Sequence, residues 1–151
     1  LQDMGVDIEI FDDYLIVKSD GKLNAIDELN LADAPDLLLT VAILAACAKG
    51  DTKITGVHHA RLKETDRIDT TCRELEKLGC FLEENEDGMI IRGETIYDGV
   101  VESHNDHRLA MAFSLLGLRW DVEVENGECF DVSFPDFIES MAQIGINLEL
   151  V

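Results

Sequence analysis

One short pattern occurs three times along the chain, and it constrains the fold more than any other feature. A helix-like run ends at a glycine and an alternating apolar and polar segment follows, around Gly5, Gly79 and Gly145. Glycine is favoured just after a helix because it adopts left-handed backbone angles, and strict alternation predicts a strand. The glycines lie 74 and 66 residues apart. This near-constant period predicts a repeated supersecondary unit.

The most complete copy of the unit spans residues 23–97. Residues 37–48 are apolar on all sides, which predicts a helix that is buried all round. Pro35 stands near its first turn, where the missing N–H costs nothing. The expected order is β-α-β-α-β-β, with elements at 23–29, 37–48, 52–57, 64–78, 80–84 and 89–92.

Partial copies flank this unit. Residues 1–22 are interpreted as the tail of a truncated unit, with a hairpin that turns at Asp12-Asp13. Residues 98–151 form the last unit, and its expected elements are a strand at 100–103, a buried helix at 106–118, a strand at 122–125, a helix at 134–144 and a strand at 146–150. The predicted class is α+β, built from repeated βαβαββ units with buried parallel helices, and 151 residues suffice for one core.

Two polar strings place cations at the expected starts of helices. They are Lys-Glu-Thr-Asp-Arg at 63–67 and Asn-Asp-His-Arg at 105–108. A cation at a helix N-terminus costs roughly 0.3–1 kcal/mol, whereas an anion is stabilised there, so an anionic ligand would explain the pattern. If the buried helices run parallel, their N-termini lie at the same end of the molecule, and six candidate site residues come together at this mouth. These are Asp36, Lys63, Glu64, Arg67, His107 and Arg108.

The formal net charge is −20, from 12 basic and 32 acidic residues. This balance argues against nucleic-acid partners and against anionic membrane surfaces, which require basic patches. Three of the twelve basic residues nevertheless fall within seven positions, at Arg61, Lys63 and Arg67. No apolar run is long enough to span a bilayer, and the start at Leu1 has no signal-peptide pattern. We therefore expect a cytoplasmic protein and interpret the chain as a fragment.

Each motif also has a plain structural interpretation. Lys63 and Arg67 could neutralise neighbouring acids on a solvated helix face, Asp36 and Asp106 could be helix caps, and His107 could be a structural hydrogen-bonding group. The four cysteines have no framework spacing and are interpreted as buried reduced thiols. The histidine pairs at 58–59 and at 104 and 107 lack the further ligands of a zinc site.

Taken together, the strings resemble the 5-enolpyruvylshikimate-3-phosphate (EPSP) synthase family in order and spacing. The resemblance covers essentially the whole chain. It implies two domains of βαβαββ units arranged as an inside-out α/β barrel, of which this chain resembles the latter part of the C-terminal domain. The strings that carry it are Leu-Asn-Ala-Ile-Asp at 23–27, Pro-Asp at 35–36, Arg-Leu-Lys-Glu-Thr-Asp-Arg at 61–67, Asn-Asp-His-Arg-Leu-Ala-Met-Ala at 105–112 and Ser-Phe-Pro-Asp-Phe at 133–137.

The resemblance implies transfer of the enolpyruvyl group of phosphoenolpyruvate to the 5-hydroxyl of shikimate 3-phosphate, with release of phosphate and no cofactor or metal. Asp36 would be the base toward that hydroxyl, Lys63 would contact it, and Glu64 would carry protons to and from the methylene carbon. Arg67 and Arg108 would grip phosphoenolpyruvate.

His107 would orient Glu64 or the substrate. The resemblance also implies that the missing N-terminal part of the same protein completes the site, so the chain alone should be inactive, and we expect a monomer.

Two positions depart from the family pattern, and other functions remain open at this stage. Val132 stands where a lysine is common and His59 where an asparagine is common, so one contact to each substrate is in doubt. The alternatives are an enolpyruvyl transferase that acts on a UDP-N-acetylglucosamine-type sugar, an RNA 3′-phosphate cyclase, which the charge of −20 disfavours, and a non-catalytic repeat domain.

Overall fold

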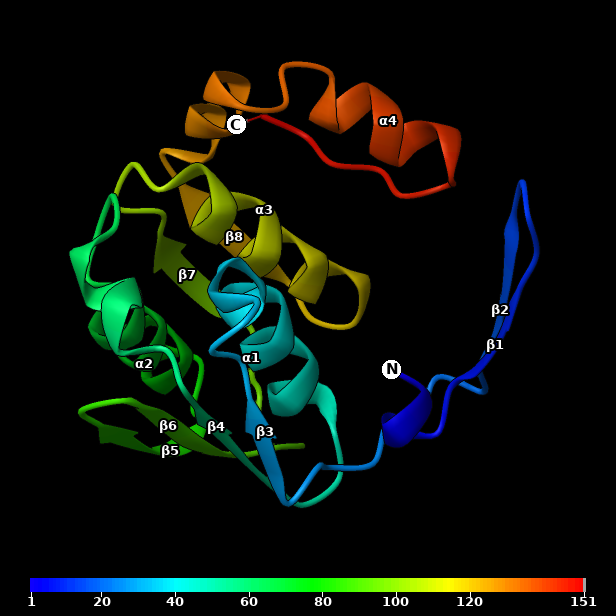
Figure 1. The fold of residues 1–151 in the computed structure, drawn as a ribbon. Helices are drawn as coiled ribbons and strands as arrows, with labels where there is room; N and C mark the ends of the chain where they lie inside the picture. The colour runs from blue at the N-terminus through cyan, green and yellow to red at the C-terminus, as the bar shows by residue number, and fades with distance from the viewer. Residues whose placement is uncertain (151) are drawn as a thin grey trace.

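The computed structural model describes residues 1–150, and it contains one complete unit in the expected order (Figure 1). The strands and helices of this unit are β3 (Glu28–Asn30), α1 (Leu38–Cys47), β4 (Asp51–Thr55), α2 (Arg67–Lys77), β5 (Phe81–Asn85) and β6 (Gly88–Arg92). The predicted order β-α-β-α-β-β is therefore confirmed, although the first strand covers Glu28–Asn30 rather than residues 23–29.

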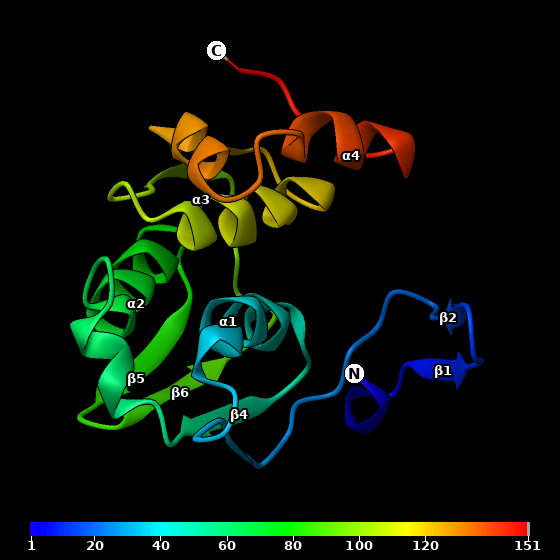
Figure 2. The same cartoon turned by 45° about the horizontal axis from the view of Figure 1, so that its top comes forward.

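The four strands of this unit form one sheet in the order β3-β4-β6-β5. β3 and β4 are parallel, and the pairs β4–β6 and β5–β6 are antiparallel. Helices α1 and α2 lie over one face of the sheet, as Figures 1 and 2 show. The layer between them buries Ile54, Met89 and Ile91, so alternate residues of β4 and β6 supply the floor of the core.

The described residues after 98 contain two strands and two α-helices. Strands β7 (Gly99–Glu102) and β8 (Val122–Glu125) pair in parallel, and α3 (His107–Ser114) contacts α1. A 3₁₀ turn at Leu115–Leu118 extends α3, another spans Gly127–Val132, and α4 covers Phe137–Gln143. The predicted helices at 106–118 and 134–144 are thus shorter than expected.

Residues 146–150 do not form the predicted strand. Their alternation is genuine, but a strand is defined by its pairing, and no other strand of residues 1–150 pairs with this segment. The glycine before it does behave as predicted. Gly5, Gly79 and Gly145 have φ of 92°, 84° and 87°, the left-handed conformation expected after a helical turn.

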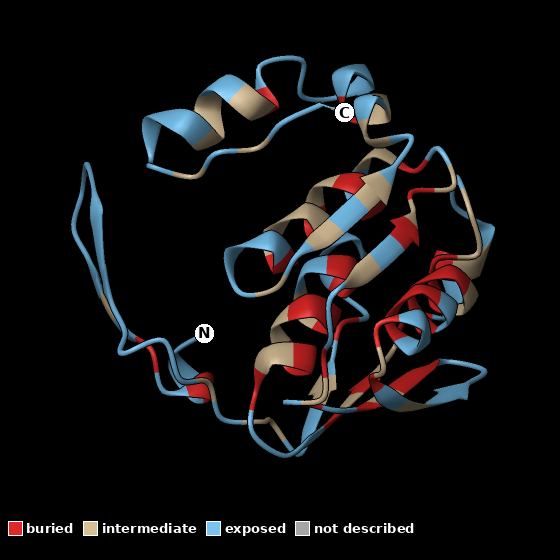
Figure 3. Cartoon of the chain, turned by 180° about the vertical axis from the view of Figure 1, so that it is seen from behind, coloured by how far each residue is buried: buried red, intermediate tan, exposed pale blue. Residues whose placement is uncertain are grey.

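Helix α1 is not buried all round, contrary to the prediction. Its inner face is fully enclosed, whereas Thr40 is exposed and Leu44 and Cys47 are half-buried. Figure 3 shows the same helix changing from buried to partly exposed around its circumference. The less buried face lines an apolar groove of about 330 Å³ that also includes Val17 and Trp120.

The N-terminal residues form a 3₁₀ turn at Gln2–Met4 and the predicted hairpin, with β1 at Asp7–Ile10 and β2 at Leu15–Lys18. Its strands project away from the rest of the chain (Figure 2). All four cysteines are free thiols, but only Cys72 and Cys80 are buried. Within residues 1–150, no helix is long and apolar enough to cross a membrane, and no cluster of three or more His, Cys, Asp or Glu residues could hold a metal ion.

Candidate active site

The guanidinium of Arg67, the first residue of α2, is the centre of the candidate site. It is 2% exposed, and its Nε and Nη2 donate to the two carboxylate oxygens of Asp106 at 2.7 and 3.1 Å. Nη2 also reaches Glu64 Oε2 at 2.7 Å, and Nη1 reaches Asp36 Oδ1 at 3.3 Å. One arginine therefore joins three carboxylates from segments that precede three different helices, and the starts of α1 and α3 meet as predicted.

Helix α2 begins at Arg67, later than the predicted range of 64–78. Asp66 is its N-cap, and the Asp66 carboxylate accepts from the backbone amides of Ile68 and Asp69 at 3.2 and 3.1 Å. Lys63 and Glu64 consequently lie before the helix rather than in its first turn, which corrects the prediction. An aspartate that satisfies two free N–H groups is a strong start signal, and it overrides the helix propensity of the residues before it.

Arg61, the third member of the basic cluster, has a structural role. Its guanidinium pairs with Asp66 at 2.9 Å and with Glu84 at 2.8 Å, and it donates to the carbonyl oxygens of Asn85 and Glu86. Arg61 thus ties the segment before α2 to the β5–β6 turn. This bracing fixes the position of the adjacent Lys63 and Glu64.

Asp106 is the structural acid of the site. It is fully buried and caps α3 by accepting from the backbone amides of Arg108 and Leu109 at 3.0 and 3.4 Å. Burial acts to raise the pKa of Asp106, but the hydrogen bonds and charge of Arg67 and the two backbone amides outweigh it, so the pKa is lowered. Asp106 therefore remains a carboxylate and holds Arg67 in place.

Asp36 is the exposed acid of the site. Its side chain is 47% exposed, and it lies in the 3₁₀ turn Pro35–Leu37 that leads into α1. Burial acts to raise its pKa, but the charges of Arg108, Lys63 and Arg67 and a hydrogen bond from Lys63 together lower it overall. The distances from Asp36 to the nitrogens of Lys63, Arg67 and Arg108 are 3.4, 3.3 and 3.5 Å.

The formal charges of the cluster cancel, but its side chains differ in how far they are exposed. Three cations (Lys63, Arg67 and Arg108) face three carboxylates (Asp36, Glu64 and Asp106), so the formal sum is zero. Lys63 and Arg108 are 35% and 43% exposed, and each makes only a long ion pair with Asp36 among residues 1–150. Both can therefore turn toward an anion at little cost.

The interpretation of Arg67 as one charge on a solvated face is wrong, because its side chain is buried. Asp69, one of the acids considered for that face, pairs instead with Arg73 at 3.1 Å. His107, the first residue of α3, is partly buried, and its imidazole makes no hydrogen bond or ion pair within residues 1–150. Its orienting role remains a prediction.

Sequence reasoning missed a second buried acid, Glu74. Its carboxylate accepts from the backbone amide of Glu102 at 2.9 Å and contacts His104 Nε2 at 2.8 Å. Burial acts to raise the pKa of Glu74, but Lys77, the Glu102 amide and His104 together lower it. His104 and Asn105 have φ of 52° and 57°, so this brace holds a left-handed loop directly before Asp106. Glu74 lies two helical turns after Arg67, and this spacing could have indicated that it is buried like Arg67.

The fold and this constellation can be compared with known proteins. The enolpyruvyl transferase NikO from Streptomyces tendae aligns over 94% of the chain at a TM-score of 0.71 and 20% identity, which shows a shared fold. An EPSP synthase from Acinetobacter baumannii aligns over 99% of the chain, at a TM-score of 0.89 and 32% identity. The fold is therefore an α+β fold of the enolpyruvyl transferase type.

The family model for EPSP synthase (3-phosphoshikimate 1-carboxyvinyltransferase) matches residues 1–141, so the chain belongs to this family. The 3-phosphoshikimate 1-carboxyvinyltransferase of Methanobrevibacter smithii is 66% identical over the whole chain, and that of Methanothermobacter thermautotrophicus is 51% identical over 99% of it. The chain spans 34% and 35% of the lengths of these two relatives. These findings confirm the resemblance seen in the motifs.

Proposed function

We propose that the full-length protein containing this chain transfers the enolpyruvyl group of phosphoenolpyruvate to the 5-hydroxyl of shikimate 3-phosphate, in the shikimate route to aromatic amino acids. The hydroxyl oxygen bonds to C2 of phosphoenolpyruvate while C3 gains a proton, which gives a tetrahedral intermediate. Loss of a proton from C3 then expels phosphate and restores the double bond. Each step moves a proton at a carbon or oxygen, so the site needs positioned acids, bases and cations rather than a cofactor.

Asp36 and Lys63 would act on the hydroxyl. A lowered pKa keeps Asp36 ionised at neutral pH, and its exposure leaves the carboxylate open to a substrate. Asp36 would accept the hydroxyl proton, and Lys63, which pairs with it at 3.4 Å, would stabilise the developing oxygen charge.

Glu64 would move the proton at C3 of the enolpyruvyl group. Its side chain is 46% exposed, and it bonds Arg67 through Oε2. A single carboxyl that donates in the addition and accepts in the elimination satisfies both halves of the reaction. His107 would orient this carboxyl or the substrate.

Arg67 and Arg108 would hold the anionic groups of phosphoenolpyruvate. Asp106 occupies the Nε and Nη2 edge of Arg67 from the buried side, while Asp36 and Glu64 reach Nη1 and Nη2. A substrate anion would replace one of these two more exposed contacts. Arginine suits this exchange because its planar fork binds carboxylate and phosphate in a bidentate manner.

The remaining part of the full-length protein would complete the site. The chain spans about a third of the length of its relatives, and Asp36, Lys63 and Arg108 of the cluster are partly exposed. We infer that shikimate 3-phosphate and phosphoenolpyruvate are enclosed only when the rest of the same polypeptide covers this surface. We further propose that the enzyme works as a monomer in the cytoplasm.

The observation that carries the proposal is the gathering of Asp36, Glu64 and Asp106 around one buried arginine, in a chain that belongs to the EPSP synthase family. The test is release of phosphate from phosphoenolpyruvate by the full-length protein. We expect release only when shikimate 3-phosphate is present, and none with UDP-N-acetylglucosamine as the acceptor.

A matched pair of substitutions assigns the chemistry to Glu64. Glu64→Gln keeps the shape of the side chain but removes its acid–base function, and it should lower turnover by about 10²–10⁴-fold. Glu76→Gln changes an exposed glutamate on α2 and should leave turnover unchanged. Equal effects of the two changes would contradict the proposed role, and phosphate release without shikimate 3-phosphate would contradict the reaction.

A further inference from the structure

Helix α2 holds the loop 102–106, the entry loop of α3, at two points. At the start of α2, the guanidinium of Arg67 bonds both carboxylate oxygens of Asp106 at 2.7 and 3.1 Å. Two helical turns later, the carboxylate of Glu74 accepts from the first backbone amide of the loop at 2.9 Å and contacts His104 Nε2 at 2.8 Å. The two attachments therefore secure opposite ends of the same loop.

Glu74 is a fully buried charge on α2, and its neighbours Cys72 and Leu75 are buried apolar residues. A buried carboxylate costs free energy unless it is paired and hydrogen-bonded, whereas an apolar side chain would fill this place without that cost. One partner of Glu74 is Lys77 of the same helix, at 2.7 Å. Its other hydrogen-bond partners within residues 1–150 belong to the entry loop, so the charge of Glu74 serves to hold this loop.

The entry loop needs this hold because its backbone is strained. His104 and Asn105 have φ of 52° and 57°, so two consecutive residues other than glycine adopt the left-handed conformation. Histidine and asparagine tolerate these angles better than most residues, but such a segment persists only where surrounding contacts determine it. Loss of the contact with Glu74 would let the loop relax, and Asp106, the next residue, would shift with it.

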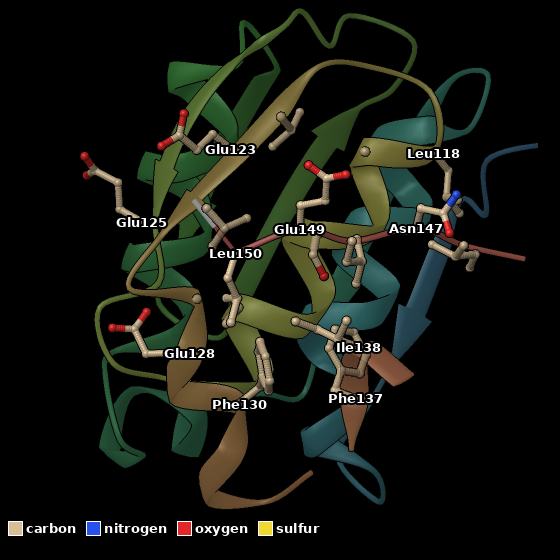
Figure 4. Close-up of a pocket in the computed structure, with 18 of the residues that line it drawn as sticks. Leu118, Glu123, Glu125, Glu128, Phe130, Phe137, Ile138, Asn147, Glu149 and Leu150 are labelled. Atoms are coloured by element: carbon tan, nitrogen blue, oxygen red, sulfur yellow. The ribbon is translucent and has the colours of Figure 1, made fainter. Parts of the chain in front are cut away.

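The segment after β8 holds the loop from another side. The amide of Ser103 donates to the carbonyl of Glu125 at 3.1 Å, and its hydroxyl donates to the carbonyl of Asn126 at 2.9 Å. Glu125 and Asn126 also line a cavity of about 990 Å³, and Figure 4 shows Glu125 among the residues around it. Substitutions there would alter the cavity as well as the loop. Glu74 and His104 do not line that cavity, so they report on the hold of α2 alone.

We propose that Glu74 is a positioning residue for phosphoenolpyruvate, and that it acts through the entry loop on Arg67 and Arg108. This inference rests on the proposed function, which assigns both arginines to the anionic groups of phosphoenolpyruvate. Arg67 is bonded to Asp106 through Nε and Nη2, and the backbone amide of Arg108 donates to Asp106 Oδ1 at 3.0 Å. A shift of Asp106 therefore moves the two arginines together.

The effect is selective for one of the two substrates. Asp36 and Lys63, which are assigned to the hydroxyl of shikimate 3-phosphate, lie outside the entry loop and pair with each other at 3.4 Å. Loosening the loop therefore weakens the binding of phosphoenolpyruvate and leaves the binding of shikimate 3-phosphate unchanged.

Glu74→Gln in the full-length protein tests the proposal. Glutamine keeps the size of the side chain but replaces one of its two accepting oxygens with a donor. Phosphate release is measured while each substrate is varied in turn. We expect the KM for phosphoenolpyruvate to rise about tenfold, with the KM for shikimate 3-phosphate and kcat within about twofold of the parent values. Glu76→Gln, the same change at an exposed position of α2, should alter none of the three.

His104→Asn is a second variant that also covers the case in which Glu74→Gln does not fold. Asparagine tolerates the left-handed conformation as histidine does, but its side chain is too short to reach Glu74. The KM for phosphoenolpyruvate should again rise. The double variant should be no worse than Glu74→Gln alone, because both changes break the same contact.

The outcomes separate this inference from the proposed function. If the parent protein is active and the KM for phosphoenolpyruvate is unchanged in both variants, this inference alone fails. It also fails if the variants lose kcat or folded protein, measured by circular dichroism, with both KM values unchanged, because that result shows a purely structural role. An equal rise in both KM values contradicts the selectivity. A parent protein that releases no phosphate overturns the proposed function and this inference with it.

Discussion

Asp36 and Asp106 occupy corresponding positions 70 residues apart in two copies of one unit, yet their surroundings differ. Both lie just before a buried helix and both contact Arg67. Asp106 is fully buried and caps α3 through two backbone amides, whereas Asp36 is 47% exposed and lies in a 3₁₀ turn without capping α1. Asp106 therefore has a structural role, whereas Asp36 is accessible to a ligand.

The difference follows from the segments before the two helices. Pro35 fixes a tight turn that leaves Asp36 at the surface, where three cations surround its carboxylate. Before α3, the left-handed residues His104 and Asn105 turn the chain inward, and the buried Glu74 holds that loop. A repeat therefore conserves the position of a residue without conserving its role.

Asp106→Ala should have the largest effect. It leaves Arg67 buried with one partner fewer and removes the cap of α3, so we expect the full-length protein to lose about 3–5 kcal/mol of stability. Chemical denaturation monitored by circular dichroism measures this loss. A change below about 1 kcal/mol would show that Asp106 is not the structural acid.

Asp36→Asn should have a large effect on turnover and a small one on stability. Turnover should fall by about 10²–10⁴-fold because the proposed base is lost. Stability should change by no more than about 1 kcal/mol, since Lys63 and Arg108 are partly exposed and the buried Arg67 keeps Asp106 and Glu64 as partners. Parallel assays of phosphate release and denaturation distinguish the two. A loss of stability that matches Asp106→Ala would remove the distinction between the two aspartates.

Acidification should reveal Asp106 through its lowered pKa. A carboxyl whose pKa is lower in the folded state binds protons more readily when the protein is unfolded. Its contribution to the free energy of unfolding is therefore complete above the unfolded pKa of 3.8 and is lost as pH falls through the folded pKa. Below pH 3.8, the free energy of unfolding should fall by at most about 1.4 kcal/mol per pH unit for this group.

Asp106→Asn is the comparison for the pH experiment, because it removes the titrating group while keeping its shape. Denaturation curves recorded from pH 5 to pH 2.5 should be flatter for this variant than for the parent protein. Identical slopes would mean that other carboxyls account for the acid sensitivity.

Arg73→Ala should have the smallest effect. Arg73 lies on α2 like Arg67, but its pair with Asp69 is exposed, so we expect a change within about 0.5 kcal/mol and no change in turnover. Thermal denaturation and phosphate release check this. A marked loss of activity would show that charge on α2 in general, rather than Arg67, supports the site.

Local patterns predicted those parts of the fold that depend on neighbouring residues. The apolar run of α1, the hairpin β5–β6 and the left-handed glycines follow from side-chain periodicity and turn chemistry. Residues 146–150 have the correct alternation but no paired strand among residues 1–150, because local alternation does not determine whether a partner strand lies alongside. The start of α2 was placed too early because the helical spacing of apolar residues does not locate the cap, which is Asp66.

The residues of the charged cluster could be predicted from the sequence, but the burial of their side chains could not. Six residues were expected at one mouth, and ion pairs join five of them. Nothing local indicates that Arg67 is 2% exposed, because arginine is normally found at the surface and its burial depends on Asp106, 39 residues away. The partners of Glu74, which are His104 and the amide of Glu102, are also distant in the sequence, so only its spacing from Arg67 could have indicated its burial.

Isothermal titration calorimetry of phosphoenolpyruvate binding to the full-length protein tests the central claim most directly. We predict that shikimate 3-phosphate strengthens this binding, and that Arg108→Ala abolishes the effect while Arg73→Ala preserves it. Binding of phosphoenolpyruvate that ignores both shikimate 3-phosphate and Arg108 would contradict the assignment of this cluster as the site.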